Sequence, residues 1–177
     1  HLAVSLEQTF TTLAAPLLPL VTAHYPLDEG TGTTTADASG NAQHATLTGA
    51  TGLPQWTGGI RDAALYFDGV DDSVRITPSI VSGSPLDLSG KHRTYAAWVR
   101  WDNNYTKYIV ASNDGAAHLN GLFTTNDTNR GRFRLAVDGG TLPDSTVVCT
   151  AVTPIAGRWY HVAGTWDGAV ARIYVDG

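Results

Sequence analysis

The chain has 177 residues, a formal net charge of −5, 15% charged residues, one cysteine and no methionine. This acidic balance without a basic cluster excludes a nucleic-acid-binding surface, and the single cysteine excludes a disulfide framework or a cysteine-based zinc site. No apolar run is long enough to predict a membrane-spanning helix. Lysine and glutamate are scarce, whereas threonine, valine and glycine are abundant. We therefore expect an all-β protein.

Residues 1–22 are predicted to form an N-terminal extension, distinct from a domain over residues 23–177. Leu2, Val4 and Leu6 alternate with smaller residues, which is the pattern of a short β-strand. We expect this segment to be a linker, or a strand that packs on its own domain or is donated to a neighbouring copy.

From residue 23 onward, short apolar runs alternate with turn residues. The dipeptide Asp-Gly occurs five times and favours the positive backbone angles of tight hairpin turns. The predicted strands are residues 64–67, 73–76, 95–101, 108–112, 132–137, 146–152, 160–166 and 169–175. Short strands at this spacing predict a two-sheet antiparallel β-sandwich.

The last predicted hairpin can be placed in register. A two-residue Asp-Gly turn at 167–168 pairs Val162 with Ile173 and Tyr160 with Val175. These four residues are apolar or aromatic, so their face of the hairpin is expected to point into the core.

The opposite face of this hairpin is mixed in character. In the predicted register it carries His161 beside Tyr174, with Arg172 further along the strand. Sandwiches normally expose one such face to solvent, and the alternative is that these three side chains contact a ligand.

Four segments in order resemble laminin G-like, concanavalin A-like lectin/glucanase jelly-roll domains. They are residues 21–49 (VTAHYPLDEGTGTTTADASGNAQHATLTG), 64–76 (ALYFDGVDDSVRI), 94–100 (TYAAWVR) and 157–177 (GRWYHVAGTWDGAVARIYVDG). The resemblance extends over residues 21–177. It implies a two-sheet antiparallel jelly roll that is usually secreted, often binds carbohydrate or protein, and often holds calcium.

Domains of this family normally continue past the Tyr-Val-Asp-Gly motif into further strands. The resemblance therefore implies either that part of the sandwich is supplied from elsewhere or that the sequence is a fragment of a longer chain. Residues 1–12 are a candidate, within the same chain or from a neighbouring copy, because an uncovered edge strand pairs readily with another chain.

Two loops are rich in the oxygen ligands that calcium prefers, at residues 37–41 and 67–72. The candidate calcium ligands are Asp37, Asn41, Asp71 and Asp72. The alternative is that these side chains only shape turns through hydrogen bonds to their own backbone.

Aromatic residues are a common carbohydrate-binding surface, because the C–H faces of sugars pack on aromatic rings. Trp101, Asn103 and Tyr105 lie in or beside one polar loop and are candidate ligand-binding residues, as are His161, Arg172 and Tyr174. We expect Trp98, Trp159 and Trp166 to lie in the core.

No motif of a hydrolase is present, and we expect a chain that is not an enzyme. Glycoside hydrolases use paired carboxylates, and neither Glu7 nor Glu29 lies in such a motif. Asp71 and Asp72 are adjacent, so on a strand they would point to opposite faces.

The first interpretation is a secreted or cell-surface jelly-roll module that binds a glycan or an extracellular protein and belongs to a larger protein or assembly. The first alternative is the subunit of an extracellular filament or other homo-oligomer, assembled through N-terminal strand donation. The second alternative is an accessory carbohydrate-binding region of a glycoside hydrolase or lyase.

Overall fold

The computed structural model describes residues 21–76, 86, 92–102, 107–113, 119–125, 132–137 and 146–177. These residues form strands and no helix, so none of them builds a helix able to cross a membrane. The strands are β1 (Thr34–Thr35), β2 (Ala45–Thr48), β3 (Gln55–Gly58), β4 (Ala63–Tyr66), β5 (Ser73–Ile76), β6 (Arg93–Arg100), β7 (Tyr108–Asn113), β8 (Leu119–Thr125), β9 (Arg132–Val137), β10 (Thr146–Cys149), β11 (Trp159–Trp166) and β12 (Ala171–Val175). The predicted all-β class is confirmed.

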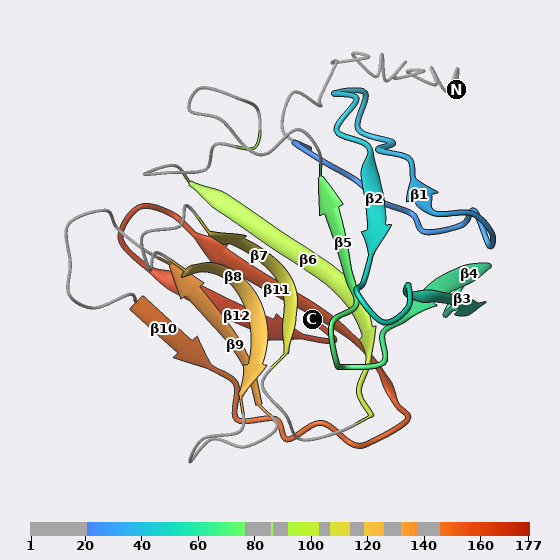
Figure 1. Ribbon diagram of the computed structural model, residues 1–177. Coiled ribbons are helices and arrows are strands. Elements are labelled where there is room, and N and C mark those ends of the chain that lie inside the picture. Colours follow the sequence, from blue (N-terminus) through green and yellow to red (C-terminus); the bar gives the residue numbers. More distant parts are fainter. Residues whose placement is uncertain are drawn as a thin grey trace, which may run out of the picture.

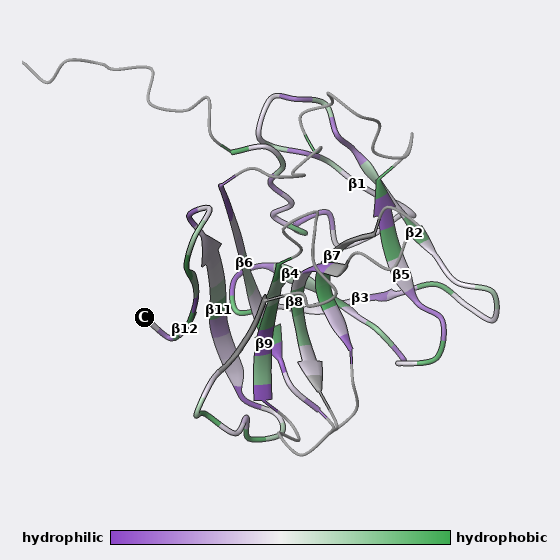
Figure 2. Cartoon of the chain, turned by 90° about the vertical axis from the view of Figure 1, so that its left-hand side faces the viewer, coloured by the Kyte–Doolittle hydropathy of each residue, from purple (hydrophilic) through white to green (hydrophobic). Residues whose placement is uncertain are grey.

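Two antiparallel sheets form the body of a β-sandwich. One has the strand order β10–β9–β8–β7 and the other has the order β12–β11–β6. Figure 2 shows the two layers nearly edge-on, with β6, β11 and β12 on the left and β7, β8 and β9 on the right. The buried cluster between them consists of Tyr95, Leu122, Phe133, Leu135, Val137, Tyr160 and Val162. Burial of these large side chains is the main stabilisation of the fold.

Two smaller sheets lie beside this sandwich (Figure 1): β1–β2–β5 and the hairpin β3–β4. The sequence patterns did not predict β1, β2, β3 or β8. Gly69 adopts the positive φ expected of an Asp-Gly turn, but the strands on either side of it, β4 and β5, belong to different sheets and do not form a hairpin.

The last hairpin forms, but its register differs from the prediction. Each residue of β11 pairs with the residue of β12 two positions after its predicted partner. Val162, for example, pairs with Val175 instead of Ile173. The connecting loop has four residues rather than two, because Asp167 Oδ1 accepts hydrogen bonds from the amides of Ala169 and Val170 at 3.0 and 2.7 Å. A shift of two residues leaves every side chain on its predicted face.

Gly164 explains how the two sheets approach so closely at the middle of β11. A Cβ atom at this position would lie 2.8 Å from side-chain atoms of both Leu122 and Leu135 on the facing sheet. Glycine in a central strand costs conformational entropy, and here it provides the space into which two fully buried leucines pack.

Candidate functional site

The outer face of the sheet β6–β11–β12 carries exposed aromatic side chains. Tyr95 on β6 points into the core, so Ala96 and Trp98 point outward by the alternation of a strand. Trp98 is 51% exposed and Tyr174 on β12 is 42% exposed. Exposed rings that gather on one sheet face, rather than single exposed residues, mark a candidate binding surface.

The strand register arranges these side chains in rows across the sheet. Trp98 lies opposite His161, and their rings are 5.2 Å apart between centroids with a tilt of 59°. In the next row Ala163 lies between Ala96 and Tyr174. Trp98, His161 and Tyr174, with the two alanines among them, are called the aromatic platform below.

The dimensions of the aromatic platform follow from sheet geometry. Trp98 and Tyr174 are two strands apart and two residues out of step. With ordinary strand spacing and rise, their Cα atoms lie about 12 Å apart. Ala96 and Ala163, which lie in one row with Tyr174, have small side chains that project little above the sheet surface.

Three arginines lie along the ends of these strands, and each is held by an aspartate. The pairs are Arg172 with Asp167 at 2.7 Å, Arg158 with Asp176 at 3.0 Å, and Arg100 with Asp102 at 3.9 Å. The hydrogen bond from Arg172, together with two backbone amides, lowers the pKa of Asp167 to about 2. The closest of these pairs therefore stays ionised on both sides at neutral pH.

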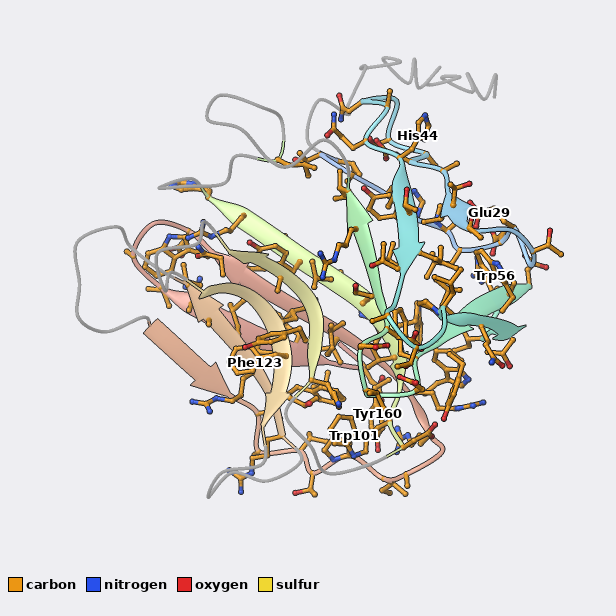
Figure 3. All side chains as sticks on the ribbon, in the orientation of Figure 1. Glu29, His44, Trp56, Trp101, Phe123 and Tyr160 are labelled. Carbon is orange, nitrogen blue, oxygen red and sulfur yellow. The ribbon has the colours of Figure 1, made fainter. Side chains whose placement is uncertain are left out.

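Trp101, the aromatic residue first expected to contact sugar, lies in the core. It is 7% exposed, and its ring packs edge-on against Phe133 at 6.5 Å. Figure 3 shows it close to Tyr160 at one end of the sandwich. Trp101 thus has no free ring face, whereas Trp98, expected in the core, is exposed. Asn103 and Tyr105 lie outside the described residues.

A signal for the exposure of Trp98 exists in the sequence. Within 93–100, Tyr95 and Val99 alternate with Trp98 and Arg100. Alternation places Trp98 on the face of Arg100 and opposite to Tyr95 and Val99, although Arg93 shares the face of Tyr95 and is buried.

Asp37, predicted to bind calcium, accepts hydrogen bonds at both carboxylate oxygens from its own loop and from His24. Its carboxylate accepts hydrogen bonds from the amides of His24, Ser39 and Gln43 at 2.9, 2.9 and 3.0 Å and from the Ser39 hydroxyl at 2.8 Å. Burial alone would raise its pKa, but these hydrogen bonds outweigh that effect and lower the pKa to about 2. Both oxygens of Asp37 therefore already accept hydrogen bonds within the chain, and its role as a calcium ligand stays a prediction.

Asn41 has a related structural role. Its side-chain amide donates to the carbonyl oxygens of Val21 and Thr22 at 3.0 and 3.1 Å. Asp37, Ser39 and Asn41 thus form an N-terminal clamp, which fixes the first described residues to the body of the domain.

The second predicted loop brings three carboxylates together. Asp68, Asp71 and Asp72 each place an oxygen within 4.8 Å of the other two. Asp71 and Asp72 were predicted as ligands, and Asp68 was not. Both predicted ligands precede β5 in a loop, so the expectation from strand geometry that their carboxylates point apart does not apply. Asp37 is not part of this acidic loop.

The acidic loop retains oxygen atoms that its own chain does not use. Asp72 Oδ2 accepts a hydrogen bond from the Asp68 amide at 2.9 Å, but Asp72 Oδ1 is buried without a partner among the described residues. The ammonium group of Lys107 donates to the Gly69 carbonyl in the same loop. A buried carboxylate oxygen beside two further carboxylates fits a hard cation such as calcium.

The edge of β6 bears on the strand-donation hypothesis. β6 pairs with β11 along all eight residues, and its other edge pairs with no strand in the described part of the chain. The predicted donor residues Leu2, Val4 and Leu6 lie outside the described residues.

Comparison with known proteins identifies the family. A sequence profile of the laminin G type, described as the concanavalin A-like lectin/glucanases superfamily, matches residues 68–177. The chain belongs to this family. The resemblance seen in the sequence motifs is thereby confirmed. No curated protein matches the chain significantly.

Two solved structures share the fold. One is an S-layer domain-containing protein from Clostridium thermocellum, with 25% identity, a TM-score of 0.54, and coverage of 86% of this chain and 67% of the other. The second is domain 4 of an extracellular arabinanase from Geobacillus stearothermophilus, solved in complex with arabinotriose, with 19% identity and a TM-score of 0.51. It covers 87% of this chain and 70% of the other chain.

Proposed function

We propose that this chain is a non-catalytic, extracellular carbohydrate-binding module whose aromatic platform stacks on sugar rings. The observation that carries the proposal is the 51% exposure of Trp98, on a sheet face that also exposes Tyr174. Burying such rings against an apolar sugar face removes them from water, and nearby polar groups orient the ligand. Membership of a superfamily that includes lectins supports this use of the sheet face.

The extracellular location is supported by the S-layer domain-containing protein, which is 25% identical to this chain. An accessory region of a larger glycoside hydrolase or lyase would use the aromatic platform in the same way. A module of a larger binding protein and an accessory region of an enzyme would therefore bind carbohydrate at the same site.

The non-catalytic role is supported by Glu29, whose carboxylate does not fit a general acid. Glu29 accepts hydrogen bonds from the Thr35 hydroxyl and the Ala36 amide at 3.0 and 2.8 Å, and these outweigh burial and lower its pKa. A general acid for glycoside cleavage needs a raised pKa instead.

A glycan array with the intact chain and the Trp98→Ala variant tests the proposal. We expect the intact chain to bind a defined set of glycans, the variant to lose that binding, and the bound glycan to be recovered unhydrolysed. Tyr66→Ala is the matched control, because Tyr66 is 45% exposed and lies on β4, outside the platform. Binding that survives Trp98→Ala, or the absence of any glycan ligand, would overturn the proposal.

We further propose that the acidic loop binds calcium through Asp68, Asp71 and Asp72. The unpartnered Asp72 Oδ1 supports this assignment, and bound calcium would neutralise three clustered charges and fix the loop. We expect calcium to raise the unfolding temperature of the intact chain and to have no effect on Asp72→Asn. A shift retained in Asp72→Asn, or no shift in the intact chain, would contradict the assignment.

A structural subunit is the second candidate function, favoured by the edge of β6 that no described strand covers. An extended segment with Leu2, Val4 and Leu6 at alternate positions would add to this edge by main-chain hydrogen bonds. Size-exclusion chromatography and electron microscopy of the chain with and without residues 1–12 test it. Assemblies that disappear on deletion would support strand donation, and a strict monomer would exclude it.

A further inference from the structure

We infer that the ligand of the aromatic platform is an uncharged oligosaccharide, longer than one sugar, bound obliquely across β6, β11 and β12. This inference rests on the proposed function and narrows it. Two observations carry it: the compensation of charge around the platform and the separation of its two outer rings.

The charge around the platform is compensated within the chain. Arg172, Arg158 and Arg100 are each paired with an aspartate on the same sheet or next to it, as described above. An anionic glycan would gain little from these arginines, because it would have to displace carboxylates already in place. It would also approach three aspartates of its own charge sign.

The same ion pairs suit neutral hydroxyl groups. Each pair offers guanidinium N–H donors and carboxylate acceptors side by side, and a sugar hydroxyl both donates and accepts hydrogen bonds. Arg172 and Asp167 are each nearly half exposed in their side chains, so their remaining hydrogen-bonding atoms can be reached from solvent. The rim of the platform therefore matches a polar ligand without net charge.

The geometry of the platform sets a minimum length for the ligand. Trp98 and Tyr174 lie on the two outer strands of the sheet, and their Cα atoms are about 12 Å apart by sheet geometry. A single sugar ring stacks on one of them and leaves the other in water. A ligand that contacts both rings must cross β11 between His161 and Ala163, where the His161 ring lies beside Trp98 and the small side chain of Ala163 leaves room next to Tyr174.

Isothermal titration calorimetry with neutral oligosaccharides of increasing length, the matching monosaccharides and uronic-acid oligosaccharides tests the inference. We expect neutral oligosaccharides to bind, monosaccharides to bind at least about tenfold more weakly, and salt to leave the affinity unchanged. Trp98→Ala and Tyr174→Ala are each expected to reduce the affinity about tenfold or more. Tyr66→Ala is expected to leave it unchanged.

The possible results separate the inference from the proposed function. Salt-sensitive binding of uronic-acid oligosaccharides that Trp98→Ala abolishes would overturn the inference and leave the platform as a glycan site. Monosaccharides that bind as tightly as oligosaccharides, or a Tyr174→Ala variant with full affinity, would also overturn it. If no glycan of either charge binds, both the proposed function and the inference fall.

Discussion

The two faces of the sheet β6–β11–β12 differ in what their side chains are free to do. On the inner face, Tyr160 and Val162 are 2% and 0% exposed, and they pack against the opposite sheet. On the outer face of the same sheet, Trp98 on β6 and Tyr174 on β12 are about half exposed. One sheet thus presents side chains for stability on its inner face and side chains available for binding on its outer face.

The two aspartate-rich loops show the same contrast in polar groups. Asp37 uses both carboxylate oxygens to hold the N-terminal clamp, whereas Asp72 keeps one buried oxygen without a partner in the described residues. Composition predicted both loops as calcium sites. What separates them is one oxygen atom, because Asp72 Oδ1 has no partner in the described residues, whereas both oxygens of Asp37, like both oxygens of Asp71, accept hydrogen bonds.

The largest change in the free energy of unfolding is expected when two neighbouring residues of β11 are substituted in turn. Tyr160→Ala removes a ring packed edge-on against Phe133 at 5.6 Å, and we expect it to destabilise the fold by about 3–5 kcal/mol. His161→Ala on the outer face is expected to change stability by less than about 1 kcal/mol. Urea unfolding of both variants measures the difference, and equal losses would break the distinction between the two faces.

The next effect compares the two loops. Asp37→Ala leaves the backbone amides of His24, Ser39 and Gln43 without their acceptor, and we expect a loss of roughly 2–4 kcal/mol. Asp68→Ala removes one of three clustered like charges and, without calcium, is expected to leave the unfolding temperature unchanged or slightly raised. A large loss in Asp68→Ala and none in Asp37→Ala would reverse their assigned roles.

Acid unfolding sharpens the role of Asp37. Its pKa in the folded chain is about 2, below the ordinary value of 3.8, so the ionised form stabilises the fold above the ordinary pKa. That contribution, about 2 kcal/mol, is lost as the pH falls from about 4 to 2. The free energy of unfolding measured against pH should show this drop in the intact chain, and Asp37→Asn should show a smaller one.

A smaller change in stability is expected for two adjacent residues of β11, Gly164 and Ala163. Gly164→Ala places a Cβ atom against Leu122 and Leu135, and we expect it to destabilise the fold by about 1–2 kcal/mol. Ala163→Val adds two methyl groups on the outer face and is expected to be neutral within about 0.5 kcal/mol. If thermal unfolding shows that Gly164→Ala is as stable as the intact chain, the two sheets leave room for a methyl group at residue 164, which would contradict the close packing.

Much of the fold follows from local patterns in the sequence. The strands at 73–76 and 132–137 were predicted with their observed bounds, because apolar and β-branched residues alternate there between turn residues. β3, with the sequence QWTG, has a single large apolar residue, so no local pattern marks it. It forms by pairing with β4, the next strand along the chain, so what the local pattern of residues 55–58 leaves unmarked is supplied by the partner strand of a hairpin.

The site was less accessible to sequence reasoning, for two physical reasons. The hairpin register depends on the Asp167 carboxylate, which caps two loop amides and lengthens the turn, and no residue count reveals this. The role of Asp37 depends on amides from residues 24, 39 and 43, which only the fold brings together. Trp98, in contrast, could have been assigned to the outer face from its alternation with Tyr95.

The most direct test of the central claim is the affinity of the intact chain and of Trp98→Ala for a neutral oligosaccharide identified on a glycan array. We expect Trp98→Ala to keep the unfolding temperature of the intact chain and to lose about tenfold or more in affinity. An unchanged affinity in a folded Trp98→Ala variant would contradict the assignment of the outer face of β6–β11–β12 as the carbohydrate-binding site.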